Sequence, residues 1–157
     1  MSMARTTGLV GIVLVSLAIL AAPVFSAGSS SSSRRPQTDY TRAVKAVKAG
    51  HYRTAIPLLE REVARDRNSA AAYNYLGFSH RKLGNLQAAM DNYRMALQID
   101  PKHKGAHEYI GELYLMRNDL AKAKEHLAKL DDICWLGCEE YDDLKAAVRQ
   151  YEAKQQG

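Results

Sequence analysis

The sequence contains few of the residues that build covalent or catalytic sites. Its 157 residues include only two cysteines, one tryptophan and two phenylalanines. Two cysteines cannot make the disulfide framework of a small secreted scaffold, so the fold must depend on a hydrophobic core. No glycine-rich phosphate loop, nucleophile elbow or paired-carboxylate signature is present, which gives no basis for catalysis or for a bound cofactor. We therefore expect a protein that is not an enzyme.

A large excess of charge of one sign is also absent. The 22 basic and 17 acidic residues leave a formal net charge of +5, and 46% of the residues are hydrophobic, so the composition predicts a folded domain. Residues 34–105 hold 14 bases and 6 acids, whereas residues 106–157 hold 7 bases and 11 acids. This polarity disfavours nucleic acid as a partner. It suits a protein partner of mixed charge or an anionic envelope surface, although ordinary solubilising charge explains it equally well.

The one long apolar run lies near the N-terminus. Residues 9–22 are almost wholly apolar, follow Arg5 and precede Pro23. This order of segments predicts a secretory signal peptide over residues 1–28. The alternative is an uncleaved anchor, because residues 8–28 are just long enough to span a bilayer. Both alternatives predict an exported chain, either periplasmic or anchored to the inner membrane and facing the periplasm.

The body of the chain repeats itself every 34 residues, and such a period is typical of a repeat array. The middle copy carries Tyr73, Leu76, Gly77, His80, Gly84, Leu86, Ala89, Tyr93, Ala96, Ile99 and Pro101. The third copy places His107, Ile110, Gly111, Tyr114, Asn118, Leu120, Ala123, Leu127 and Leu130 at the same intervals. Residues 36–137 therefore resemble tetratricopeptide repeats, of the kind found in exported bacterial proteins.

Each copy also has the pattern of a helical hairpin. Apolar residues recur at three- and four-residue intervals on both sides of Gly84, which marks a turn, and Pro101 ends the second helix. Small residues stand where the two helices of a hairpin should cross. The predicted crossing pairs are Gly77 with Ala89, Gly111 with Ala123, and Ala43 with Ala55.

Hairpins of this type must stack to bury their apolar faces, and the last one needs a cap. One helical face of residues 139–155 supplies the cap with Tyr141, Leu144, Val148 and Tyr151. The predicted fold is all-α: a right-handed α-solenoid of three helical hairpins, similar to tetratricopeptide repeats, plus a C-terminal capping helix. The predicted divisions are a signal peptide or anchor at 1–28, a serine- and arginine-rich flexible linker at 29–36, repeats at 36–69, 70–103 and 104–137, and a capping helix and tail at 138–157.

The two cysteines, Cys134 and Cys138, stand at the junction between the third repeat and the cap. In an oxidising compartment they could form a disulfide across a turn that contains Gly137, which would clamp the cap onto the array. Unpaired thiols and a metal or redox role remain alternatives. No metal site is predicted, because two cysteines are too few for a closed zinc site. Of the five histidines only His103 and His107 have helical i, i+4 spacing, and Gly105 lies between them at the start of a helix.

The resemblance implies that the first helices of successive hairpins line a groove for a peptide or a partner helix. The groove would contain Tyr40, Val44, Lys48, Asn74, Phe78, Arg81, Lys82, Glu108, Glu112 and Leu115. Phe78 beside Arg81 would be an exposed binding hot spot, unless Phe78 fills space against the preceding hairpin. The basic and asparagine residues with which some relatives clamp a C-terminal carboxylate are missing. The expected function is a protein-binding adaptor. The alternatives are a metal- or thiol-handling protein using Cys134 and Cys138 or a self-associating structural solenoid.

Overall fold

The structure is a computed structural model, and it describes residues 38–156. The predicted signal peptide at 1–28 and the predicted linker at 29–36 lie outside the described residues. All regular structure in the described part of the chain is helical, which confirms the all-α prediction. None of the helices within 38–156 combines the length and the apolar character needed to cross a membrane.

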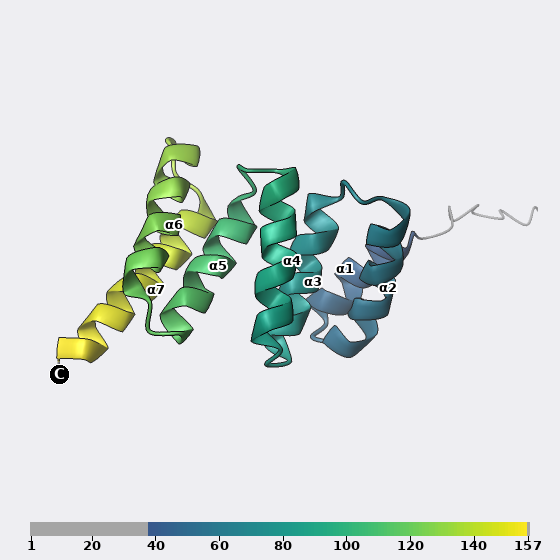
Figure 1. The fold of residues 1–157 in the computed structure, drawn as a ribbon, viewed down its shortest axis with the longest axis horizontal. Coiled ribbons are helices and arrows are strands. Elements are labelled where there is room, and N and C mark those ends of the chain that lie inside the picture. Colours follow the sequence, from purple (N-terminus) through teal and green to yellow (C-terminus); the bar gives the residue numbers. More distant parts are fainter. Residues whose placement is uncertain (1–37, 157) are drawn as a thin grey trace, which may run out of the picture. The chain divides into compact units, whose positions relative to one another are not determined.

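Seven helices follow one another along the described chain (Figure 1). Their bounds are α1 Asp39–Lys48, α2 Tyr52–Arg65, α3 Ala70–Lys82, α4 Leu86–Ile99, α5 Lys104–Met116, α6 Leu120–Ile133 and α7 Glu139–Gln156. Four of them begin with an N-cap side chain that accepts a hydrogen bond from a backbone N–H of the first turn. These N-caps are Thr38, Ser69, His103 and Asp119. Pro101 follows the end of α4 as expected, because the residue before a proline avoids helical geometry.

The helix boundaries keep the 34-residue period of the sequence. The helices α2, α4 and α6 each have 14 residues and begin at 52, 86 and 120. The turns within the hairpins keep the same period through Gly50, Gly84 and Asn118, which have φ angles of 75°, 80° and 59°. A positive φ is cheap for glycine and tolerated by asparagine, so each copy of the repeat turns at the same place.

Consecutive hairpins pack side by side and share a layered core. Helix α3 packs on α1 and α2 of the preceding hairpin and on α4 of its own, and α5 packs on α4, α6 and α7. The buried side chains form three groups along the array, one for each hairpin junction or cap. The largest fully buried residues are Tyr93, Leu59, Met90, Leu113, Leu130 and Leu144.

The small residues predicted at the helix crossings are buried, and two of the glycines also lie against large side chains. A Cβ added to Gly77 would lie 2.5 Å from Cδ1 of Tyr93, so the closest neighbour of this glycine is a ring one turn beyond Ala89 on α4. A Cβ on Gly111 would lie 2.5 Å from Leu144 on α7. Both glycines therefore leave room for a large side chain of another helix.

The capping helix packs as the sequence predicts. Leu144 is fully buried and Val148 is 4% exposed, while Tyr141 and Tyr151 lie partly buried against the same group of side chains. The polar side of α7 covers the end of the array, because charged residues occupy most positions outside this stripe.

Candidate functional site

The odd-numbered helices form one layer of the array, because α3 contacts both α1 and α5, and α5 contacts α7. All ten residues predicted to line a groove lie on α1, α3 or α5, but they differ in accessibility. Lys48 and Lys82 are exposed, and Tyr40, Val44, Phe78, Arg81 and Glu112 are half-buried. Asn74, Glu108 and Leu115 are buried.

Phe78 lies between hairpins rather than standing exposed, which corrects the expectation of an open hot spot. Its ring meets Tyr52 of the preceding hairpin edge-on, with centroids 6.0 Å apart, and meets Tyr109 of the following hairpin at 5.2 Å. Tyr109 in turn contacts Tyr93 at 5.6 Å. These four rings form a continuous contact from α2 to α5. Phe78 therefore joins three hairpins, and both Arg81 and Lys82 place a cation over its ring.

Arg81 is the central cation of this layer. Its guanidinium lies 5.5 Å from the centroid of the Phe78 ring and 4.9 Å from that of Tyr109. It also forms an ion pair and a hydrogen bond with the Glu112 carboxylate on α5. The side chains of this pair are only 13% and 26% exposed, so the attraction is screened less than that of a surface pair. Arg81 thereby fixes α3 against α5 at the middle of the layer.

Asn74 and Glu108 lie beneath this surface. They are 8% and 7% exposed, so they belong to the floor of the layer rather than to its open face. Burial raises the pKa of Glu108 to about 8, and the negative charges of Glu112, Asp143 and Glu140 add to the rise, while Arg81 opposes it. The Glu108 carboxyl group is therefore mostly protonated at neutral pH.

Several buried polar atoms of this region lack a hydrogen-bond partner within residues 38–156. They are Oδ1 of Asn74, Nε of Arg81 and the hydroxyl of Tyr93. Buried polar groups in folded proteins are nearly always paired, so three such atoms in one region mark a place where bound water or a ligand can add hydrogen bonds.

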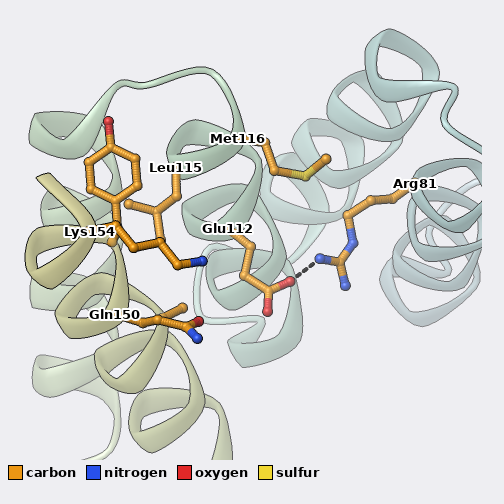
Figure 2. Close-up of a pocket in the computed structure, with 8 residues that line it drawn as sticks. Arg81, Glu112, Leu115, Met116, Gln150 and Lys154 are labelled. Atoms are coloured by element: carbon orange, nitrogen blue, oxygen red, sulfur yellow. Dashed lines mark hydrogen bonds and ion pairs between the residues drawn. The ribbon is translucent and has the colours of Figure 1, made fainter. Parts of the chain in front are cut away.

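A pocket of about 350 Å³ opens between α3, α5 and α7 beside the Arg81–Glu112 pair (Figure 2). Leu115, Met116 and Ala147 provide apolar contacts, and Met116 is 57% exposed. Figure 2 shows Arg81 and Lys154 on opposite sides of Glu112, so two cations flank one carboxylate. The remaining lining residues are Gln150 and Tyr151. This combination suits an apolar side chain with a polar or acidic neighbour.

The sequence did not predict that α7 contributes to this pocket. Extending the 34-residue step from the predicted groove positions 108, 112 and 115 would select 142, 146 and 149, whereas the pocket contains Ala147 and Gln150. The loops before α3 and α5 have four residues, but the loop before α7 has five. The extra residue shifts the inward positions of α7 by one, to 143, 147 and 150. A comparison of loop lengths could have revealed this shift.

The first groove residues on α1 are not part of the pocket. Tyr40 meets Tyr75 of α3 edge-on, with centroids 6.1 Å apart, and packs on the core of the first hairpin. Lys48 lies exposed at the end of α1. The structure thus brings Arg81, Glu112 and Leu115 together in one pocket and leaves Tyr40, Val44 and Lys48 apart from it.

Cys134 and Cys138 lie at disulfide-bonding distance, with sulfurs 2.04 Å and Cα atoms 5.6 Å apart. The turn between them contains Gly137, whose φ is 88°, and the Gly137 N–H donates to the Cys134 carbonyl oxygen. The pair closes the loop between α6 and α7 as the clamp hypothesis requires. Neither sulfur is a free thiol in this arrangement.

Two histidines form a pair between α5 and α6, in which His107 is buried and His126 is half-buried. Nε2 of His107 lies 3.0 Å from the Pro101 carbonyl oxygen, and Nδ1 of His107 lies 3.0 Å from Nδ1 of His126. A carbonyl only accepts, so Nε2 of His107 carries the proton, Nδ1 of His107 accepts, and Nδ1 of His126 donates. Burial, with the nearby His107, lowers the pKa of His126 to about 4. No group of three or more metal-ligating side chains occurs within the described residues.

Comparisons with known proteins agree with the repeat pattern. Two family models described as tetratricopeptide repeat match residues 40–104 and 80–133. The chain is 32% identical over 89 residues to a probable biofilm formation methyltransferase, WspC, of Pseudomonas aeruginosa, which covers 57% of this chain. It is 29% identical over 106 residues to tetratricopeptide repeat protein 1 of Schizosaccharomyces pombe, which covers 60% of this chain. The chain spans only 21% and 10% of these two relatives.

A similar fold occurs in the Yersinia enterocolitica type III secretion chaperone SycD, solved in complex with a peptide of the translocator YopD. The superposition has a TM-score of 0.65 and 17% identity, and it covers 74% of this chain and 92% of the chaperone chain. At this identity the similarity concerns the fold alone.

Proposed function

The chain belongs to the tetratricopeptide repeat family, and we propose that it is a non-catalytic adaptor that binds a segment of a partner protein at the pocket between α3, α5 and α7. Proteins of this fold generally act as scaffolds, and fold alone does not establish a function. The observation that carries the proposal is the pocket itself. It joins an apolar wall to two cations and one carboxylate, and it lies in the layer where a peptide partner would bind.

The chemistry of the pocket defines the segment that would fit it. A volume of about 350 Å³ accommodates one large apolar side chain, and Leu115 and Met116 would contact it. Methionine adapts its shape to different partners, because its side chain is unbranched and polarizable. An acidic group next to the anchor could pair with Lys154 or compete with Glu112 for Arg81. We therefore propose a peptide with a leucine, methionine or aromatic anchor and an adjacent acidic residue.

Selection from a displayed peptide library, followed by affinity measurement, tests this proposal. Peptides selected by the wild-type protein should share an apolar anchor with a nearby acid. Met116→Glu places a charge in the pocket and should weaken binding of the selected peptides at least about tenfold, because an unpaired charge against an apolar side chain is unfavourable. Lys154→Glu should weaken the acidic peptides selectively.

Met95 offers a matched control, because it is a methionine on α4 that is 37% exposed and does not line the pocket. Met95→Glu should leave the affinity unchanged. Equal loss of binding in the Met95 and Met116 variants, or selected peptides with no common anchor, would contradict the proposal.

Export is a separate proposal that rests on residues 1–28 alone. A signal sequence would deliver the chain to the cell envelope, where the oxidising environment would permit the Cys134–Cys138 bond. The mass of the protein from fractionated cells tests it. A cytoplasmic protein that retains residues 1–28 would rule out export.

A further inference from the structure

The most exposed large apolar side chains of the described residues lie next to each other. Trp135 is 81% exposed and Leu136 is 79% exposed, although both sit in a loop that is closed by the Cys134–Cys138 pair. Exposed neighbouring apolar residues are characteristic of contact surfaces. We call these two residues the tip. The closed loop limits the freedom of the tip, so little conformational entropy remains to be lost when it binds.

Four acidic residues flank the tip in the sequence, and we call them the acidic collar. Asp131 and Asp132 precede the tip at the end of α6, and Glu139 and Glu140 follow it at the start of α7. None of these four carboxylates has an ion-pair partner within 4.0 Å among residues 38–156. An occupant of the tip should therefore present an apolar cavity with a basic rim, because complementary charge directs association and excludes other partners.

The first hairpin contains a cavity with this chemistry. A groove of about 380 Å³ between α1 and α2 has Ala46, Ala49 and Leu58 on its apolar floor and Arg42, Lys45 and His51 at its rim. Arg42 also pairs with Asp39 at 3.2 Å, whereas Lys45 has no ion-pair partner among the described residues. We call this cavity the end groove. It has room for an indole ring, and its rim has the charge opposite to that of the collar.

We propose that the tip of one copy of this chain binds in the end groove of a second copy. The two surfaces cannot meet within one molecule, because α1 packs only on α2 and α3 among the described helices, whereas the tip joins α6 to α7. Trp135 fills the apolar floor, and the collar carboxylates pair with Lys45 and Arg42. After one contact, one copy retains a free end groove and the other a free tip. The contact is therefore heterologous and adds further copies, as an open chain or, if the rotation closes, as a ring.

The inference does not depend on the proposed peptide pocket, because neither the tip nor the end groove shares a residue with that pocket. A contact made by one loop is small, and small interfaces are weak. Association should therefore depend on concentration. It should also weaken at about 1 M salt, where the Debye length falls to about 3 Å. An anionic membrane is the less suitable occupant, because the collar repels negative headgroups.

The experiment uses sedimentation velocity together with fluorescence of Trp135, the sole tryptophan of the sequence. For the oxidised wild-type protein, the sedimentation coefficient should rise with concentration, and the emission of Trp135 should shift to shorter wavelength as the ring is buried. Trp135→Ser should remove the rise. Lys45→Glu should reduce it at least about tenfold in apparent association constant, because the rim then repels the collar. Arg94→Glu reverses an exposed base on α4 that belongs to neither surface and should leave association unchanged.

Mixing the two defective variants gives the sharpest result. Trp135→Ser retains an intact end groove, and Lys45→Glu retains an intact tip. A mixture of the two should therefore form dimers and no larger species, with a fluorescence shift from the Lys45→Glu copy. The inference would be overturned by a wild-type protein that stays monomeric up to about millimolar concentration, because a dissociation constant above this value corresponds to very weak association. It would also be overturned by association that neither variant affects, or by a mixture that stays monomeric. A further outcome would also overturn the inference: a protein that stays monomeric but binds vesicles of phosphatidylglycerol and phosphatidylcholine through Trp135. The tip would then bind a membrane rather than a second copy.

Discussion

Replacing Glu108 by glutamine should remove much of the dependence of stability on pH between about pH 4.5 and pH 8. The folded protein holds this carboxyl group with a pKa of about 8, against 4.5 for an unperturbed glutamate. Between these two values the folded chain keeps a proton that the unfolded chain has released. Raising the pH through this window therefore favours unfolding, and stability is progressively lost from about pH 4.5 up to about pH 8.

The size of the effect follows from the shift in pKa. A rise of about 3.5 units, at about 1.4 kcal/mol for each unit, gives a ceiling of roughly 5 kcal/mol. Local relaxation and water entry lower the real cost of burying a charge, so we expect a loss of roughly 2–3 kcal/mol in the wild-type protein between about pH 5 and pH 9. Glutamine has nearly the same shape and no charge, so Glu108→Gln should lose far less stability over that range.

Urea unfolding followed by circular dichroism at about pH 5, 7 and 9 measures this difference, since the free energy of unfolding is obtained from the midpoint and slope. Glu125→Gln is the control, because Glu125 is an exposed acid on α6 and its replacement should leave the pH dependence as it is. Parallel pH profiles for the wild-type protein and Glu108→Gln would refute the argument, because they would show that Glu108 does not carry a buried proton.

Three further perturbations test the packing, the histidine pair and the closed loop. Gly77→Ala should lower the free energy of unfolding by roughly 1–3 kcal/mol, because its Cβ would lie 2.5 Å from the buried ring of Tyr93; thermal unfolding equal to that of the wild-type protein would contradict this contact. The folded-state pKa of His126 is lowered to about 4, so the free energy of unfolding should fall by roughly 1–2 kcal/mol as the pH drops from 6.5 towards 4. Urea unfolding of His126→Asn should show a smaller loss over the same pH range. Reducing the Cys134–Cys138 bond, which closes a five-residue loop, should cost about 2 kcal/mol by the chain-entropy relation, and unchanged urea midpoints with and without reductant would argue against a bond.

The repetition of the sequence allowed the helical architecture to be predicted. Periodic apolar positions, turn residues such as Gly84 and the Pro101 stop all act locally, so each can be recognised without knowing what lies across the interface. The buried stripe of the capping helix, with Leu144 and Val148, was predicted for the same reason. These features confirm the all-α solenoid of hairpins, because each recurs with the period of the helix or of the repeat.

The candidate site was predicted less well, because accessibility depends on neighbours from other hairpins. The repeat positions predicted that Glu108 and Phe78 line the groove. In the structure, the packing of α7 buries Glu108, and the packing of Tyr109 leaves Phe78 half-buried. The partner of Arg81 lies 31 residues away on α5. The histidine pair likewise joins positions on two helices. A periodic pattern in the sequence does not specify which side chain of one helix contacts which side chain of another.

A single additional residue accounts for two features that the repeat pattern did not predict. The loops before α3 and α5 have four residues, and the loop before α5 contains Pro101, whereas the loop before α7 has five residues and begins at Cys134. One consequence is the shifted register of α7, which brings Ala147 and Gln150 to the pocket beside Glu112. The other is a turn long enough to close on itself and to hold Trp135 away from the array. Shortening this loop by one residue should therefore alter the pocket and the tip together, whereas substitutions confined to either surface should leave the other unchanged.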